Sequence, residues 1–273
     1  MTDRYAVIGH PVGHSKSPLI HGLFAAATAQ DISYIKLECP LDGFADAVRR
    51  FRAEGGRGLN VTLPFKLQAL ALATQAQPAA CEAGAANALR FVGDEIEAEN
   101  SDGVGLVRDL VHNLGTPLAG ARVLLLGAGG AVRGALRPLL AAGPARVIVV
   151  NRDIAKARQV VAELGGEPRA AACGYGDLGS ERFDVVIDGT SASLRGELPP
   201  IRATLFAPGA TAYEMVYGKG LTPFLRLARD AGVARLADGV GMLVEQAAEA
   251  FAWWRGVRPA TEPVIARLAV PLL

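Results

Sequence analysis

The chain of 273 residues has little of several features that mark whole classes of protein. It has only three cysteines, Cys39, Cys81 and Cys173, which lie far apart and have no histidine partner at the spacing of a zinc site. We therefore expect reduced thiols, no metal site and a cytoplasmic location. The formal net charge is only +1. A nucleic-acid-binding protein usually carries a basic excess on one face, so we expect no nucleic-acid partner.

Long apolar segments are also missing from the sequence. No run approaches the roughly 18 apolar residues that cross a bilayer, so we expect no membrane partner. The first residues lack the basic start, apolar stretch and cleavage site of a secretory signal. The overall balance, 51% hydrophobic and 20% charged, is that of a globular protein long enough for two domains.

Lysine is scarce compared with arginine. Of the 28 basic residues only five are lysines, namely Lys16, Lys36, Lys66, Lys156 and Lys219. Lysine can exchange a proton near neutral pH and arginine cannot, which draws attention to Lys66 at the end of "RGLNVTLPFK". Asn60 and Thr62 share one face of the strand in this segment, and Pro64 ends it. Either a strand runs into a solvated turn, or it delivers three polar groups to one side of a binding site.

Short apolar segments alternate with helical patterns along the whole chain, which indicates layered α/β architecture with mainly parallel strands. We predict two domains. The first spans residues 1–101 and is completed by C-terminal helices within residues 239–273. The second spans residues 102–238, and its strand–helix order predicts a doubly wound parallel sheet.

A glycine-rich turn opens the second domain. "VLLLGAGGAVRG" places Gly127, Gly129 and Gly130 between an apolar strand and a helix, although Val132 replaces the last glycine of the usual pattern. Glycines there let backbone N–H groups approach a pyrophosphate at a helix N-terminus, which is typical of a Rossmann-type dinucleotide domain. Ordinary turn chemistry is the alternative, but the flanking strand–helix–strand order favours a cofactor.

The end of the next strand predicts which dinucleotide binds. Asn151 and Arg152 stand where sites specific for NAD carry an acidic residue, and Lys156 follows one helical turn later. Two cations and an amide suit the 2′-phosphate of NADP, with Asp153 as a discordant neighbour. The alternative is a pair of solvated cations, which the dipole of the following helix would oppose.

Polar residues in the first domain stand where strands end or helices begin. Ser15 and Ser17 lie at the start of a helix, and Ser17 is explained equally well as an N-cap. Asn87 ends a small-residue segment, and Asp102 opens another helix, where a plain N-cap is again the alternative. Gln246 interrupts the apolar stripe of the last long helix, so it either reaches a ligand or is a buried amide. Such groups suit a polyhydroxylated small molecule.

Eight motifs together carry a resemblance to a known family. In chain order they are "HSKSPLIH", "NVTLPFK", "AGAANAL", "ENSDGVG", "GAGGAVRG", "NRDIAKA", "EMVYGKGLTPFL" and "DGVGMLVEQAAEAF". This order resembles that of the shikimate dehydrogenases over nearly the whole chain. The resemblance implies NADPH-dependent reduction of 3-dehydroshikimate to shikimate, on the pathway to chorismate and the aromatic amino acids, in a cleft between two α/β domains.

The resemblance also implies roles for individual residues. Lys66 and Asp102 would be the catalytic pair. The implied substrate ligands are Ser15, Ser17, Asn60, Thr62, Asn87, Tyr217 and Gln246. The implied cofactor ligands are Gly127, Ala128, Gly129, Gly130, Ala131, Asn151, Arg152, Lys156, Met215 and Gly239, the last two beside the nicotinamide.

Three positions depart from the family pattern. The family commonly has threonine at Ala88 and Ser101 and asparagine at Asp188, which opens "DGTSAS". We expect the missing hydroxyl of Ala88 to loosen a substrate contact and the charge of Asp188 to weaken NADP binding.

Other functions suit parts of the same pattern. A quinate/shikimate dehydrogenase of broader specificity is the nearest, and an NADP-sensing module without turnover would need neither Lys66 nor Asp102. A methylene-folate dehydrogenase-like protein would leave "HSKSPLIH" unexplained. The chain is expected to act as a monomer or a homodimer.

Overall fold

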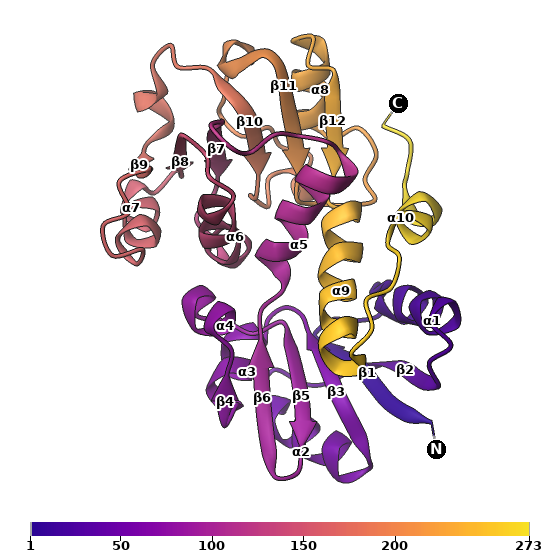
Figure 1. Ribbon diagram of the computed structural model, residues 1–273. Coiled ribbons are helices and arrows are strands. Elements are labelled where there is room, and N and C mark those ends of the chain that lie inside the picture. Colours follow the sequence, from indigo (N-terminus) through magenta and orange to yellow (C-terminus); the bar gives the residue numbers. More distant parts are fainter. Residues whose placement is uncertain (1, 273) are drawn as a thin grey trace. The chain divides into compact units, whose positions relative to one another are not determined.

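The computed structural model describes residues 2–272, and its contacts divide the chain into two compact units. The first unit comprises Met1–Gly105 and Val244–Val264, and the second comprises Leu106–Leu243 and Ile265–Leu273. Each is a sheet with helices on its faces (Figure 1). The predicted domain boundaries, after residues 101 and 238, lie several residues before the observed division points, after residues 105 and 243. The residues after Val264 belong to the second unit, whereas the prediction places them in the first.

These differences have one physical reason. The chain crosses between units inside continuous helices: α5 (Asp102–Arg108), α9 (Val240–Arg255) and α10 (Glu262–Leu268) each contain a division point. A boundary within a helix has no linker of glycine, proline or polar residues to mark it in the sequence.

The sheet of the first unit is mixed. Its strands, in the order β2-β1-β3-β5-β6-β4, are β2 (Ile32–Glu38), β1 (Asp3–Gly9), β3 (Gly56–Val61), β5 (Ala88–Val92), β6 (Glu95–Glu99) and β4 (Gln75–Ala76). β5 pairs antiparallel with β3 and β6, and the other pairs are parallel. The tight turn at Gly93, with φ +53°, allows only a hairpin between β5 and β6, because a parallel connection needs a long crossover.

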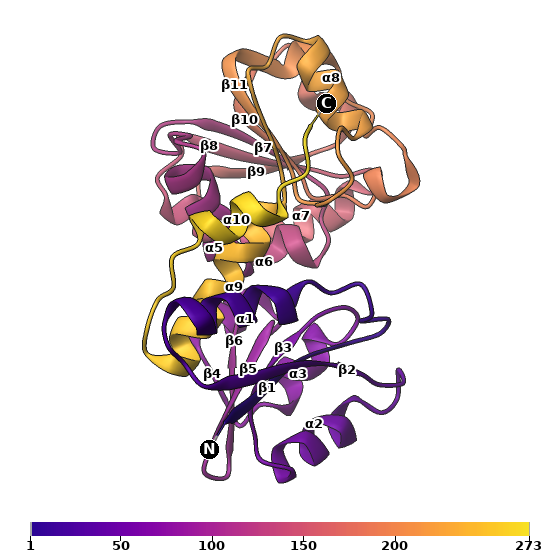
Figure 2. The same cartoon turned by 90° about the vertical axis from the view of Figure 1, so that its right-hand side faces the viewer.

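Helices cover both faces of this sheet (Figure 2). One face forms a core with α2 (Phe44–Ala53), α3 (Lys66–Leu72) and α4 (Pro78–Ala83). The other packs against α1 (Ser17–Ala27) and the part of α9 that belongs to this unit, where the Trp254 ring stacks on that of Tyr5 and its indole N–H donates to the Leu89 carbonyl at 3.0 Å.

The second unit contains a parallel sheet in the order β12-β11-β10-β7-β8-β9. Its strands are β7 (Arg122–Leu126), β8 (Arg146–Val150), β9 (Ala170–Cys173), β10 (Phe183–Asp188), β11 (Phe206–Glu214) and β12 (Arg235–Asp238). One face packs against α5, α6 (Gly130–Ala141) and α7 (Ile154–Ala162), and the other against α8 (Pro223–Asp230) and short turns. The predicted doubly wound, Rossmann-type sheet is confirmed.

Several irregular elements complete the second unit. A π-helical segment, η1 (Asp109–Asn113), continues α5, and the 3₁₀ turns are η2 (Tyr175–Leu178), η3 (Ser193–Arg195) and η4 (Ala203–Leu205). Two short strands, β9 and β4, are not predicted by the sequence pattern. β9 reads "AAAC", an edge strand whose alanines have low strand propensity and whose residues are only partly buried.

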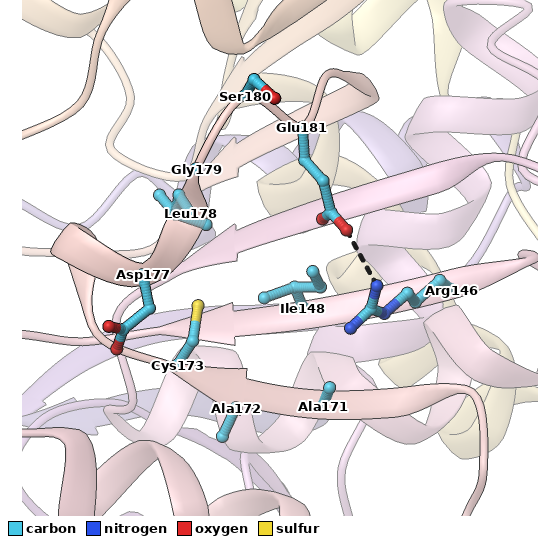
Figure 3. Close-up of a pocket in the computed structure, with 10 residues that line it drawn as sticks. All are labelled: Arg146, Ile148, Ala171, Ala172, Cys173, Asp177, Leu178, Gly179, Ser180 and Glu181. Atoms are coloured by element: carbon cyan, nitrogen blue, oxygen red, sulfur yellow. Dashed lines mark hydrogen bonds and ion pairs between the residues drawn. The ribbon is translucent and has the colours of Figure 1, made fainter.

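The second unit also has a shallow pocket of about 230 Å³ over β8 and β9 (Figure 3). It is lined by Arg146, Ile148, Ala171, Ala172, Cys173 and the turn from Asp177 to Glu181. An ion pair of 2.9 Å between Arg146 and Glu181 lies across it. None of the predicted cofactor residues lines this pocket.

Within residues 2–272, no helix combines the length and apolar character needed to cross a bilayer. The same residues contain no group of three or more histidine, cysteine, aspartate or glutamate side chains arranged to hold a metal ion.

Candidate active site

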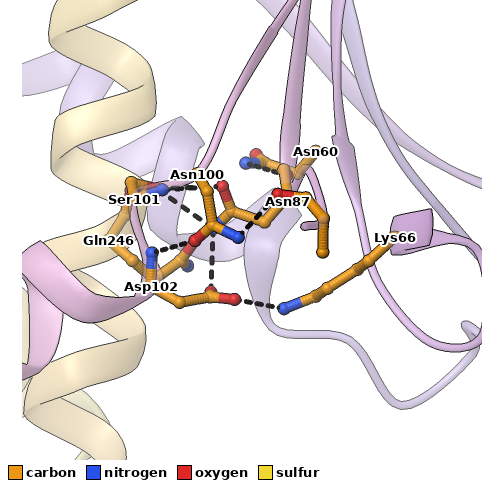
Figure 4. A network of polar contacts seen from close by, with 8 residues as sticks. Asn60, Lys66, Asn87, Asn100, Ser101, Asp102 and Gln246 are labelled. Atoms are coloured by element: carbon orange, nitrogen blue, oxygen red, sulfur yellow. Dashed lines mark hydrogen bonds and ion pairs between the residues drawn. The ribbon is translucent and has the colours of Figure 1, made fainter. Parts of the chain in front are cut away.

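Lys66 is the first residue of α3, and its side chain is directed at Asp102 and only partly exposed. Its Nζ lies 2.5 Å from Oδ2 of Asp102, and the two side chains are 28% and 13% exposed (Figure 4). β3 ends at Val61, before the proline, as the sequence predicts. The interpretation of this segment as a strand end with a freely solvated lysine is therefore wrong.

Asp102 is the first residue of α5, and its carboxylate turns toward the polar cluster rather than capping the helix. Oδ2 faces Lys66, and Oδ1 accepts a 2.8 Å hydrogen bond from Nδ2 of Asn87. The backbone N–H of Asp102 instead donates to Oδ1 of Asn100 at 3.1 Å. The alternative that Asp102 serves only as an N-cap is wrong.

Asn87 is the centre of this cluster. Its amide nitrogen also lies 3.0 Å from Oγ of Ser101 and 3.1 Å from Oε1 of Gln246, and its amide oxygen accepts the Ser101 N–H at 2.9 Å. Asn87 is 2% exposed, so water cannot easily compete for these bonds. Ser101 keeps the hydroxyl of the family's threonine, and this hydroxyl donates to the Gln246 carbonyl at 3.0 Å.

Two further hydrogen-bonded pairs lie at the start of α1 and between β2 and β3. Oγ of Ser15 donates to Oγ of Ser17 at 3.2 Å, and the helix N-cap is Lys16 rather than Ser17, so the capping alternative for Ser17 is wrong. Asn60 is 6% exposed, and its amide oxygen accepts the hydroxyl proton of Tyr34 at 2.6 Å. Thr62 follows β3 and is half-buried.

Tyr34 also belongs to this site, although the sequence motifs do not predict it. It lies on β2, the strand next to β1 at one edge of the sheet. Burial raises the pKa of its hydroxyl, and a hydrogen bond with Ser17 opposes part of that rise. The buried ring of His21 stacks on the Tyr34 ring with centroids 4.3 Å apart, and burial lowers the pKa of His21 to about 3. The one sequence signal for Tyr34 is the alternation of side chains between the two faces of the strand "SYIKLE", which predicts the face on which Tyr34 lies.

Ala88 stands beside this group. It is fully buried on β5, in register with Asn60 on β3, so the hydroxyl that the family's threonine would supply is missing next to the Asn60 amide.

In the second unit, strand register brings the predicted cofactor residues to one edge. Leu126 pairs with Val150 and Asp188, and Asp188 pairs with Glu214, which pairs with Asp238. Each of these residues ends its strand, so the segments that follow all begin at the carboxyl edge of the sheet. In an open α/β sheet this is the edge where ligands bind. The predicted cofactor residues Gly127–Ala131, Asn151, Arg152, Met215 and Gly239 follow these strand ends.

The glycine turn has the form that a pyrophosphate requires. Gly127 has φ +103°, and a Cβ there would lie 3.2 Å from the Gly189 carbonyl oxygen, so only glycine is accommodated. Around Gly129 and Gly130 an added Cβ would meet nothing within 4 Å. α6 begins at this turn with no acidic residue in its first turn. The backbone and the space fit a dinucleotide phosphate.

The residues after β8 keep their cations in solvent. Arg152 and Lys156 are exposed, and Arg152 Nη2 lies 3.7 Å from Oε2 of Glu197. Oδ1 of Asp153 accepts the Ala155 N–H at 3.0 Å, so this carboxylate caps α7 instead of forming the ribose contact of an NAD site. Asn151 donates to the Asp153 carbonyl at 3.0 Å. This arrangement fits the 2′-phosphate of NADP.

Met215 and Gly239 lie against each other in the same unit. A Cβ on Gly239 would come within 2.2 Å of the Met215 carbonyl oxygen, and the Met215 N–H donates to the Asp188 carbonyl at 2.8 Å. Tyr217 is half-buried two residues further along the chain, also in this unit, and burial raises its pKa.

Two buried carboxylates occupy the ends of β10 and β11. Asp188 and Glu214 are in register and each is 0% exposed. Burial raises the pKa of Asp188 to about 6. Burial and the negative charge of Asp188 raise the pKa of Glu214 to about 7, while Ser193 and Thr222 donate hydrogen bonds to Glu214.

The chain is similar to known proteins over nearly its whole length. Residues 7–89 match the shikimate dehydrogenase substrate binding domain, residues 109–195 match shikimate / quinate 5-dehydrogenase, and residues 239–269 match the shikimate 5′-dehydrogenase C-terminal domain. A shikimate dehydrogenase (NADP(+)) of Aromatoleum aromaticum is 56% identical over 269 residues, covering 97% of this chain and 96% of the relative. The chain belongs to the shikimate dehydrogenase family.

Solved structures of similar proteins have the same fold as this chain. An Ael1 enzyme from Pseudomonas putida is 58% identical, with a TM-score of 0.97 over 100% of both chains. Shikimate 5-dehydrogenase from Thermus thermophilus in complex with NADP(H) and shikimate is 31% identical, with a TM-score of 0.87 over 98% of this chain and 100% of that one. The resemblance and the fold class drawn from the sequence are thus confirmed. The roles of single residues stay predictions.

Proposed function

We propose that this protein is an oxidoreductase that reduces 3-dehydroshikimate to shikimate with NADPH, a step on the pathway to chorismate and the aromatic amino acids. The observation that carries this function is the Lys66–Asp102 pair, which holds a proton donor beside amides suited to a polyhydroxylated acid. Family membership supplies the substrate class, and the geometry of the first unit supplies the groups that the reaction needs.

The polar residues of the first unit bind the substrate. Ser15 and Ser17 take its carboxylate, because paired hydroxyls at the start of a helix donate to an anion. The proposed partners of the ring hydroxyls are Asn60, Thr62, Asn87 and Gln246, with Tyr217 as a further ligand. The Tyr34 bond occupies the amide oxygen of Asn60, and the amide nitrogen lies 3.5 Å from the Asn87 carbonyl oxygen, so the second N–H of this nitrogen is the proposed donor to the substrate.

Lys66 acts as the general acid. Reduction of a ketone places negative charge on its oxygen, and an ammonium at that oxygen stabilises the charge and gives up a proton. Asp102 orients Lys66 and accepts a hydrogen bond from a neighbouring substrate hydroxyl. Asn87 fixes the Asp102 carboxylate through Oδ1, so the carboxylate presents Oδ2 to the ammonium. The proton on Lys66 is then restored from solvent, because its side chain is partly exposed.

The second unit holds the cofactor. When bound, NADPH supplies the hydride that reduces the carbonyl carbon. Residues 127–131 hold the pyrophosphate through backbone N–H groups, and Met215 and Gly239 flank the nicotinamide. Asn151, Arg152 and Lys156 bind the 2′-phosphate, where the planar guanidinium of Arg152 offers two parallel donors. We further propose that the protein works in the cytoplasm as a monomer or a homodimer.

One assay tests the proposed function. Purified protein is mixed with shikimate or quinate and with NADP or NAD, and formation of reduced cofactor is followed spectrophotometrically. The proposal expects rapid turnover with shikimate and NADP and much slower turnover in the other three combinations. Comparable rates with quinate would indicate a broader dehydrogenase, and no turnover with either substrate would contradict the proposal.

A further inference from the structure

A buried pair of side chains in the second unit lies outside the machinery described above. Asp109 is 3% exposed in the π-helical segment η1, and Tyr213 is fully buried on β11. The Tyr213 hydroxyl donates to Oδ2 of Asp109 at 2.6 Å. Burial and the charge of Asp109 raise the pKa of Tyr213 well above its usual range, so the hydroxyl keeps its proton.

This pair contacts the N-terminal turn of α9, the residues from Gly239 to Met242, which directly follow β12. The Tyr213 oxygen accepts the backbone N–H of Met242 at 3.2 Å, which satisfies one of the free donors at the start of α9. Oδ1 of Asp109 is so close to Gly241 that a Cβ there would lie 1.9 Å from it. Oδ1 also accepts a 2.9 Å bond from Asn113, which holds the carboxylate in place.

The same turn contains one of the residues assigned to the nicotinamide. Gly239 begins it, packed against the Met215 carbonyl, and its N–H donates to the Val216 carbonyl at 3.3 Å. Met215 itself follows Tyr213 by two residues along the chain. Tyr213 is thus tied to both segments, to one by the chain and to the other by a hydrogen bond.

We propose that Asp109 and Tyr213 are a positioning pair that holds the turn from Gly239 to Met242 against Met215, and so determines where the nicotinamide end of NADP binds. This inference rests on the proposed function, which assigns the nicotinamide to Met215 and Gly239. A π-helical segment at Asp109 is consistent with it, since such insertions are frequent at functional sites.

The test uses direct binding to separate the two ends of the cofactor. Affinities of the full-length protein for NADP and for adenosine 2′,5′-bisphosphate, which lacks the nicotinamide, are measured by titration calorimetry. Tyr213→Phe removes both the bond to Asp109 and the bond from Met242, and is expected to weaken NADP binding about tenfold, while the bisphosphate binds as to the wild type.

A control and a second variant keep the test decisive. Thr211→Val removes a buried 3.0 Å bond to Thr116 on the same strand but away from the turn, and should leave both affinities unchanged. Gly241→Ala drives the Asp109 carboxylate away from its place and should reproduce the selective loss even if Tyr213→Phe does not fold. The double variant with Tyr213→Phe should bind NADP little more weakly than either single variant, because both substitutions act on the contact between Asp109 and Tyr213.

Equal weakening of both ligands, or a selective effect no larger than that of Thr211→Val, would overturn the positioning role. Failure of the wild-type protein to bind NADP at all would instead overturn the proposed function on which this inference rests. The two failures are therefore distinguishable in the same experiment.

Discussion

Lys66 and Asp102 lie 36 positions apart in the chain, yet Nζ of one is 2.5 Å from Oδ2 of the other. β3 and the turn after it place Lys66, while the end of β6 and the start of α5 place Asp102. Asn87, from the segment before β5, joins them by its bond to Oδ1. Three separate segments of the first unit thus meet at the Asp102 carboxylate.

Replacing Lys66 should affect turnover more than binding. Lys66→Ala removes the proton donor, so we expect kcat to fall by about two orders of magnitude or more with a smaller change in KM for shikimate. Lys66→Arg is the matched control, because arginine keeps the charge beside Asp102 but cannot release its proton near neutral pH. Steady-state kinetics measure both. Near-normal turnover in either variant would exclude Lys66 as the acid.

Cofactor preference should depend on the charge at Arg152. Arg152→Asp places a carboxylate where the 2′-phosphate is proposed to bind, so preference should shift toward NAD. Glu197→Gln should do the opposite and improve NADP binding severalfold, because it removes the carboxylate that faces Arg152 at 3.7 Å. The ratio of kcat/KM for NADP and NAD checks both variants. An unchanged ratio in Arg152→Asp would place the phosphate elsewhere.

Variants of Gln246 test whether this residue binds the substrate or only stabilises the fold as a buried amide. Its Oε1 accepts a bond from Asn87, and its amide nitrogen is the proposed donor to the substrate. We expect Gln246→Ala to raise KM for shikimate severalfold with KM for NADP unchanged. Gln246→Glu keeps the oxygen that Asn87 contacts but loses the N–H donors, and should behave like the alanine variant. Unchanged KM values would favour a structural amide.

The buried acids at the ends of β10 and β11 predict a dependence of stability on pH. Because the pKa of Asp188 rises from 3.8 to about 6, the folded protein keeps a proton that the unfolded chain releases between these values. Stability therefore falls as pH rises through this window, by an amount on the order of 3 kcal/mol. Glu214 extends the fall to about pH 7.

The variant Asp188→Asn should remove the part of this pH dependence of stability that comes from Asp188. Urea unfolding should show the variant more stable than wild type by about 1 to 3 kcal/mol near pH 8, and little different near pH 4, where wild-type Asp188 is already protonated. The control is Asp184→Asn on the same strand, where the bond from Arg122 lowers the pKa of the carboxyl. That variant should lose stability near pH 8. Destabilisation of Asp188→Asn at both pH values would contradict the prediction.

Much of the architecture could be predicted because it is encoded locally. The glycine turn, the alternation of strands and helices and the stop at Pro64 each depend on a few neighbouring residues. β9 and the exact division between units were not predictable in this way. Three alanines and a cysteine form a strand only because β8 offers them an edge, and the units divide inside helices whose local sequence is continuous.

The order of the amino acids establishes the kinds of groups at the site: a lysine, an aspartate, amides and hydroxyls at strand ends, and cations after β8. Which of these groups meet depends on the folded arrangement of distant segments. It pairs Lys66 with Asp102, joins Tyr34 to Asn60 and sets Asp188 beside Glu214. Such pairings depend on strand register and on side-chain orientation across distant segments, which periodicity and local propensity do not encode.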